Sequence, residues 1–186
     1  MHPRIAELRA YLDRSRATLL SAVESVPESR RDVSPASGAW SPTQVLDHLA
    51  AVEAGSVRLM AKRIARAREA GLGPDPQTSS VLDALDGQGV ASREQRWQAP
   101  EIVLPRDGAT AASALASLRE SRAALIELLG DADGLDLSAV RATHTRLGDI
   151  DMYQWALFIG QHEARHAEQI AEIAAAATAA REGSAA

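Results

Sequence analysis

The stretch WSPTQVLDHLAAVE, from Trp40 to Glu53, contains the best-marked helix start in the sequence. Ser41 is a typical N-cap residue, and Gln44 at the third helical position can complete a capping box with it. Pro42 suits the first helical position, where the backbone N–H has no helical partner in any case. A helix is therefore predicted over residues 41–70, ending where glycines and prolines follow.

Three further segments carry apolar residues at helical spacing. They cover, in order, residues 3–26, 110–129 and 150–181. A proline-containing loop over about 72–106 separates the second helix from the third and is long enough to form a lid over a site. Residues 182–186 are expected to fray.

The composition favours the same fold class. Hydrophobic residues make up 46% of the chain but aromatic residues only 3%, so the core must be built mainly from Leu, Ala, Val and Ile, most of which suit helices. A chain of 186 residues is within the size range of one hydrophobic core. We therefore predict one all-α domain over residues 1–186, a four-helix bundle with a long connection between its second and third helices.

Charge and hydropathy argue against two kinds of partner. The net charge is −5, and the arginines are mixed with carboxylates, so the sequence lacks the basic stripe that follows a phosphate backbone. No segment approaches the ~20 apolar residues that cross a bilayer, and the N-terminus has no apolar leader. The absence of cysteine fits a reducing compartment. We expect a cytoplasmic protein that binds neither nucleic acid nor membrane.

The predicted last helix contains HEARHAEQI, residues His162 to Ile170, with two histidines four positions apart. Side chains at this spacing lie on one helix face, about 5–6 Å apart at Cβ, so His162 and His166 can point at one ion. Both lie within the apolar stripe of the helix. Because HxxxH arises by chance in many helices, two hydrogen-bonded core histidines explain the pair equally well.

A third histidine changes this balance. His48 lies among the apolar positions of the predicted second helix, so it also faces the core. Inward side chains on facing helices build the metal sites of helical bundles. Three neutral imidazoles suit Zn, Ni, Fe or Cu and leave a coordination position for water or substrate.

Several neighbouring residues have two interpretations each. Gln169 shares the face of His162 and can orient a ligand histidine or bond between helices. His144 precedes the last helix and can reach the mouth of the site, cap a helix or face solvent. Arg165 can attract an anionic substrate, although an exposed side chain is the simpler expectation. Glu163, about 100° around the helix from His162, is expected to be solvated.

Two motifs together resemble a known family. WSPTQVLDHLAAVE and THTRLGDIDMYQWALFIGQHEARHAEQIAEI, residues 143–173, resemble the second-helix and last-helix signatures of DinB-like four-helix bundles. This family includes YfiT-type metal-dependent hydrolases and bacillithiol and mycothiol S-transferases. The resemblance extends from about Ile5 to Ala175. It implies that His48, His162 and His166 bind a divalent ion, commonly nickel or zinc in relatives, with iron or manganese as alternatives.

The resemblance also implies a class of reaction. The expected function is transfer of a low-molecular-weight thiol, such as bacillithiol or mycothiol, to an electrophilic small molecule in detoxification or a stress response. One alternative is a hydrolase that uses metal-bound water. A second is a metal-binding or stress-associated interaction bundle without turnover, and a third is a bundle whose histidines never meet. Many relatives associate as dimers, so a homodimer is expected.

Overall fold

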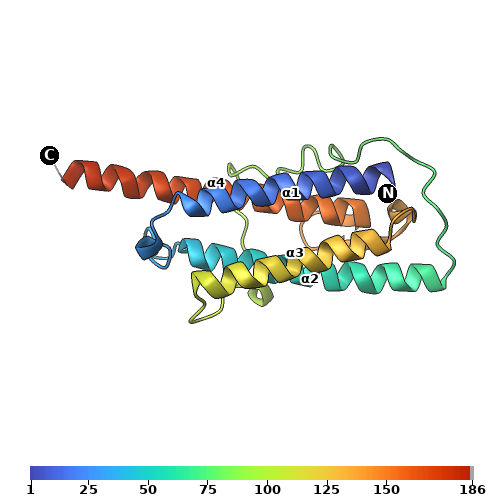
Figure 1. The fold of residues 1–186 in the computed structure, drawn as a ribbon, viewed down its shortest axis with the longest axis horizontal. Coiled ribbons are helices and arrows are strands. Elements are labelled where there is room, and N and C mark those ends of the chain that lie inside the picture. The colour runs from blue at the N-terminus through green and yellow to red at the C-terminus, as the bar shows by residue number, and fades with distance from the viewer. Residues whose placement is uncertain (185–186) are drawn as a thin grey trace.

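Four helices form the molecule in the computed structural model, which describes residues 1–184 and the side chains of residues 1–178 (Figure 1). The helices are α1 (Pro3–Glu24), α2 (Pro42–Glu69), α3 (Ala111–Asp131) and α4 (Met152–Ser184). Single 3₁₀ turns lie at Glu28–Arg30, Glu101–Val103 and Leu137–Ala139. The predicted all-α four-helix bundle is confirmed.

The helix starts follow the capping residues. The Ser41 hydroxyl accepts the Gln44 backbone N–H at 3.2 Å, and the Gln44 side chain accepts the Ser41 N–H at 2.9 Å. The capping box predicted for α2 is therefore present. A second box, between Thr110 and Ser113, starts α3.

The structure differs from the sequence prediction near the ends of α3 and α4. The third helix continues two residues beyond 129, to Asp131. An antiparallel hairpin, β1 (Arg141–His144) and β2 (Gly148–Asp151), precedes α4 and was not predicted. Helix α4 continues to Ser184, through most of the tail expected to fray, and residues 185–186 lie outside the described residues.

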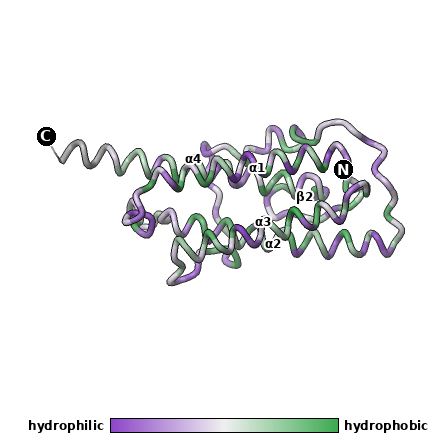
Figure 2. The backbone as a smooth tube through the Cα atoms, viewed as in Figure 1, coloured by the Kyte–Doolittle hydropathy of each residue, from purple (hydrophilic) through white to green (hydrophobic). Residues whose placement is uncertain are grey.

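The four helices pack as two close pairs. Helix α1 packs along α4, and α2 packs along α3 and also against α4. Apolar and polar residues alternate along each helix (Figure 2), as expected of amphipathic helices with one buried side. None of the helices in the described part of the chain is both long enough and apolar enough to cross a membrane.

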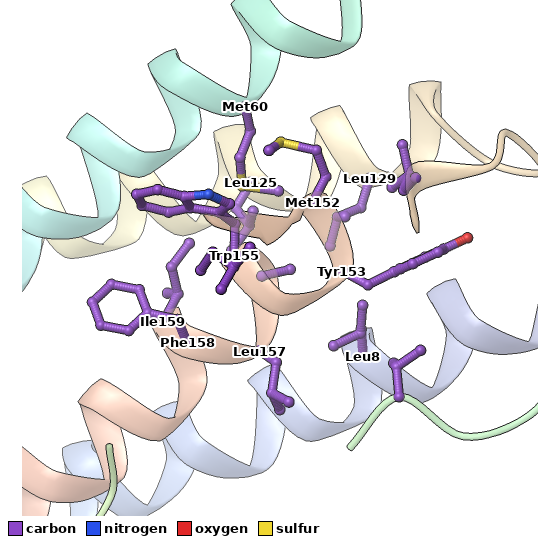
Figure 3. Packing of buried hydrophobic residues seen from close by; sticks show 14 of the residues in the cluster. Leu8, Met60, Leu125, Leu129, Met152, Tyr153, Trp155, Leu157, Phe158 and Ile159 are labelled. Carbon is purple, nitrogen blue, oxygen red and sulfur yellow. The ribbon is translucent and has the colours of Figure 1, made fainter. Parts of the chain in front are cut away.

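The buried apolar residues form two clusters along the bundle axis. The larger cluster contains Leu8, Met60, Leu125 and Phe158 (Figure 3), and the smaller contains Leu19, Leu46, Leu118 and Ile170 among others. Between the clusters, every helix contributes buried or partly buried polar residues. We call this set the polar layer; it consists of Ser15, Arg16, His48, Glu53, Ser56, Ser121, Arg122, His162, Glu163 and His166.

The connection between α2 and α3 is long, as predicted, and passes the N-terminal end of α1 before returning along the bundle (Figure 1). Its Val81, Leu85 and Val90 are buried in the larger apolar cluster. Arg4 of α1 bonds Asp75 and Ser79 of the connection. The connection is therefore part of the core, and its last part reaches the polar layer.

Candidate metal centre

Three histidines of α2 and α4 converge in the polar layer. One ring nitrogen from each of His48, His162 and His166 lies within 4.8 Å of the other two. All three residues are buried, with 4%, 7% and 7% of their surface exposed. The structure thus brings together the residues that the two sequence motifs single out, and we call them the histidine triad.

Hydrogen bonds fix which nitrogen of the His48 and His166 rings is free. His48 Nδ1 lies 2.7 Å from the Val103 carbonyl oxygen, which only accepts, so Nδ1 carries the proton and Nε2 carries the lone pair. His166 Nδ1 donates in the same way to Gln169 Oε1 at 2.8 Å. His166 Nε2 faces His162 Nε2 at 3.1 Å. Gln169 therefore orients the His166 ring by a hydrogen bond within α4; its role as the support of a metal ligand stays a prediction.

The surroundings keep the triad uncharged. Burial, followed by the nearby His48, lowers the pKa of His166 to about 3. Burial and the other two rings also hold the pKa of His162 well below its ordinary value, and burial lowers that of His48. Neutral imidazole is the form that binds metal ions.

The donor set fits a divalent transition metal ion. Three buried nitrogen donors match the preferences of zinc, nickel and iron, whereas calcium and magnesium prefer oxygen ligands. Three protein ligands leave a position for an exogenous ligand, as in catalytic zinc sites. Hydrogen bonds behind His48 and His166 supply the outer support that such ligands require.

Aromatic rings line the triad on two sides. The Trp40 ring lies 4.9 Å from the His48 ring between centroids, and Phe158 stacks on His162 at 5.3 Å. His144 lies beyond Phe158, at 4.6 Å. Its Nδ1 accepts hydrogen bonds from the backbone N–H groups of Arg146 and Leu147, so His144 stabilises the hairpin turn. The Phe158 ring separates it from the triad.

A small cavity lies beside the triad within the polar layer. Its lining residues are Leu49, Val52, Glu53, Ile159, His162 and Glu163. The cavity is therefore walled by apolar side chains, one triad histidine and two carboxylates.

The carboxylates of this cavity belong to a buried ion network that was not predicted. Arg122 bonds Glu53 at 2.7 Å and Glu163 at 2.8 Å; Arg16 bonds Glu53 at 2.8 Å and also bonds Glu163. Glu163 is only 2% exposed, so the expectation that it is solvated is wrong. The signal was present in Arg16, Glu53 and Arg122, each of which follows a core leucine by one helical turn.

Arg165 also differs from its expected state. It is 5% exposed, because the connection covers it and Gln95 accepts a hydrogen bond from its guanidinium. Burial and the nearby Arg93 and Arg146 lower the pKa of Arg165. Its charge lies beside the triad, one residue before His166.

The bundle and its triad define a class: helical bundles that carry a histidine cluster between their helices. The chain belongs to the DinB superfamily, whose family model matches residues 11–170, which confirms the resemblance seen in the sequence. A search of curated proteins found no match. The crystal structure of TT2238, described as a four-helix bundle protein, is similar in fold, with a TM-score of 0.54 and 22% identity over 89% of this chain and 96% of that chain.

Proposed function

We propose that the protein is a divalent-metal-dependent enzyme that transfers a low-molecular-weight thiol to an electrophilic small molecule. The observation that carries the proposal is the triad, in which buried neutral imidazoles turn free nitrogens toward one point within a DinB-superfamily bundle. A nickel or zinc ion held there would act as a Lewis acid and lower the pKa of a coordinating thiol. Iron and manganese are the alternative ions.

The protein's own side chains would orient the reactants and exclude water. Val103 and Gln169 fix the rings of His48 and His166 through their Nδ1 hydrogen bonds. Trp40 and Phe158 cover two of the rings with apolar surface. A dry site strengthens every charge interaction within it.

The polar layer favours thiol transfer over hydrolysis. A hydrolase benefits from a general base close to the attacking water. Glu53 and Glu163, the carboxylates of the cavity beside His162, each bond to both Arg16 and Arg122. Asp47, adjacent to His48, is bound by Arg106. These carboxylates are occupied by arginine side chains and are not free to act as the general base that hydrolysis usually uses, whereas a thiol bound to the metal ion is activated without one.

Metal content tests the proposal first. We expect protein purified without a histidine tag to hold close to one ion per chain by plasma mass spectrometry. His48→Ala and His166→Ala should lose the ion, while His144→Ala, a matched histidine outside the triad, should keep it. A parent protein that stays empty after reconstitution with nickel and zinc would contradict the metal site and favour an interaction bundle without turnover.

Thiol dependence is the second step. With the metal-loaded protein, we expect conjugation of bacillithiol or mycothiol to a model electrophile, and no conjugation by the His166→Ala variant. Metal-dependent ester hydrolysis without thiol conjugation would instead establish the hydrolase alternative.

A further inference from the structure

Two arginines meet on one short segment of the long connection, beside the histidine triad. Arg146 of the hairpin turn lies over the Trp97 ring, 4.1 Å from its centroid, and Arg165 of α4 lies 5.4 Å from the same centroid. Both guanidinium groups also bond to Gln95, Arg146 to the side-chain oxygen at 3.1 Å and Arg165 to the backbone oxygen. We call these two residues the arginine pair.

In the described part of the chain, no carboxylate forms a direct ion pair with the arginine pair, and the attraction of Glu168 for Arg165 is the weakest of the charge effects on its pKa. Among the described residues, no carboxylate oxygen lies within 4.0 Å of either guanidinium. Arg93, which is close by, does have a partner, because it bonds Glu172 at 3.1 and 2.7 Å. The pair therefore adds two positive charges to this part of the molecule, and the hydrogen bonds that hold both go to neutral oxygens of Gln95.

Arg165 is also incompletely hydrogen-bonded. The residue is 5% exposed, and its Nη1 is a buried donor without an acceptor among the described residues. Leaving a buried donor unsatisfied is costly to the folded state, and more so on a charged group. A buried donor of this kind calls for an explanation, and an acceptor on a bound ligand is one that would satisfy it.

The arginine pair lies on the triad side of the bundle. Arg165 precedes His166 and projects about 60° around the helix from His162. Arg146 follows His144 by two residues, and His144 packs against Phe158, which stacks on His162. Arg146 is exposed and Arg165 is buried beneath Gln95 and Trp97, so an incoming anion meets Arg146 first.

We propose that the arginine pair binds the anionic group, a carboxylate or phosphate, of a small molecule that reacts at the histidine triad. This inference rests on the proposed function. Guanidinium groups bind such anions through paired, charge-assisted hydrogen bonds that are stronger than bonds to a neutral amide. The anion would replace the oxygens of Gln95 and satisfy Nη1 of Arg165. Trp97 would keep the two guanidinium planes in place by cation–π contact.

Paired probes that differ only in charge test the site. With nickel-loaded protein, we expect mercaptoacetate to bind more tightly than 2-mercaptoethanol by calorimetry. Arg146→Gln and Arg165→Gln should each weaken mercaptoacetate about 10- to 100-fold, the range for a lost hydrogen bond to a charged group. The same variants should change 2-mercaptoethanol binding less than twofold and leave the nickel content unchanged. Arg93→Gln is the matched control, because Glu172 already neutralises that arginine.

A second pair of probes locates the anion on one of the two reactants. With 2-mercaptoethanol as the thiol, a preference for iodoacetate over iodoacetamide that both variants abolish would place the anion on the electrophile. In this alkylation the thiol proton passes to water, an S–C bond forms, the C–I bond breaks and iodide leaves. A preference for mercaptoacetate would place the anion on the thiol. Either preference supports the site, and the absence of both overturns it.

Two further measurements separate the possible failures. If the parent protein binds no metal, the proposed function fails, and the arginine pair is tested alone by titrating metal-free protein with inorganic phosphate while following tryptophan fluorescence. Phosphate binding that both variants abolish supports the pair; binding that neither variant changes, or no binding by the parent protein, overturns it. Gln95→Ala should retain mercaptoacetate binding. If Gln95→Ala also loses mercaptoacetate binding, the role of the arginines is only to hold the connection in place through Gln95, and the proposed anion site is overturned.

Discussion

His48 and His166 each use Nδ1 for a hydrogen bond within the protein, so each ring presents Nε2 to the centre of the triad. The two supports differ in chemistry. The Val103 group is a backbone carbonyl, which can only accept a hydrogen bond. The Gln169 group is a side-chain amide, which has an accepting oxygen and a donating NH₂ and turns its oxygen toward His166. His48 is thereby tied to the long connection and His166 to its own helix.

Removing the Gln169 acceptor should weaken metal binding without abolishing it. Gln169→Ala leaves His166 free to rotate and to exchange tautomers, and loss of such a support typically costs 10- to 100-fold in metal affinity. The measurement is a chelator competition with zinc. Glu168→Ala, which changes an exposed neighbour on the same turn, is the control. Equal zinc affinity in the two variants would show that Gln169 has no supporting role.

The sequence predicted the triad because all three histidines lie in apolar stripes, which mark the side of a helix that faces the core. It could not predict the state of Glu163 by the same logic, since that residue lies about 100° from His162. An apolar stripe marks all the buried side chains only where one face of a helix is covered. Helix α4 is covered on two faces, by α2 and by α1, and Ser15 and Arg16 of α1 form hydrogen bonds with Glu163.

Helices α1 and α4 are in close contact at Gly160. A Cβ atom at this position would lie 2.5 and 2.8 Å from two ring carbons of Tyr11 and 3.4 Å from Leu12. Gly160→Ala should therefore destabilise the protein by about 1–3 kcal/mol, the usual cost of overpacking, as measured by urea denaturation.

A second glycine provides the control for this substitution. Gly55 lies inside α2, where an added Cβ meets only the end of the Arg58 side chain, at 3.9 Å. Gly55→Ala should stabilise the protein by about 0.5–1 kcal/mol, because alanine is the better helix former. A Tyr11→Ala background should reduce the cost of Gly160→Ala. If the cost is unchanged there, the Tyr11 ring is not its cause.

The ion network links all four helices. Each helix contributes one residue to it, namely Arg16, Glu53, Arg122 and Glu163 in chain order. Glu53→Gln leaves two buried guanidinium groups with one carboxylate, and breaking a buried pair in this way costs about 3–5 kcal/mol. Urea denaturation gives the value. Asp149→Asn, which breaks an exposed pair with Arg141, should cost less than about 1 kcal/mol.

A double variant tests whether the network acts as a unit. Glu53→Gln with Arg122→Gln restores the charge balance, so its cost should fall below the sum of the two single costs. Additive costs would mean that the ion pairs contribute independently.

The hairpin before α4 shows where periodicity stops being informative. Its strands are four residues long, with one buried side chain in each, Ala142 and Ile150. The turn depends on Gly148, whose φ of 74° lies in the left-handed region that favours glycine. A strand is recognised in a sequence by alternating apolar and polar residues, and one buried position is too few to show this pattern. The hairpin was therefore not predicted, whereas the four long helices were.

Across the whole molecule, the polar layer lies between two apolar clusters and receives residues from each of the four helices. The sequence indicated each helix and each triad histidine separately. It could not indicate that the histidines and the ion network share one level of the bundle, because that level depends on how far each helix is shifted along its neighbours. The same arrangement removes the triad from water, so burial lowers the pKa values of its three histidines in the folded protein.

Stability of the metal-free protein should fall as the pH is lowered from 7 to 5. Burial holds the pKa values of the triad histidines, and of His144, below the ordinary 6.5 in the folded protein, while the unfolded chain titrates near 6.5. Below that pH the unfolded state binds more protons. The free energy of unfolding then falls by up to about 1.4 kcal/mol per pH unit for each such histidine.

Carboxylates act at lower pH and can be separated from this effect. The lowered pKa values of Asp47 and Asp75 remove stability only below about pH 4, where unfolded aspartates titrate. Burial raises the pKa of Asp151, so protonation of this group stabilises the folded protein as the pH falls and opposes the effect of the histidines.

Urea denaturation at pH 7, 6 and 5 measures how the free energy of unfolding changes with pH. His166→Gln should reduce this pH dependence by the contribution of one histidine. An unfolding free energy that stays constant over this range in both proteins would mean that the triad histidines take up protons in the folded state as readily as in the unfolded chain, and would contradict the lowered pKa values that keep the imidazoles neutral.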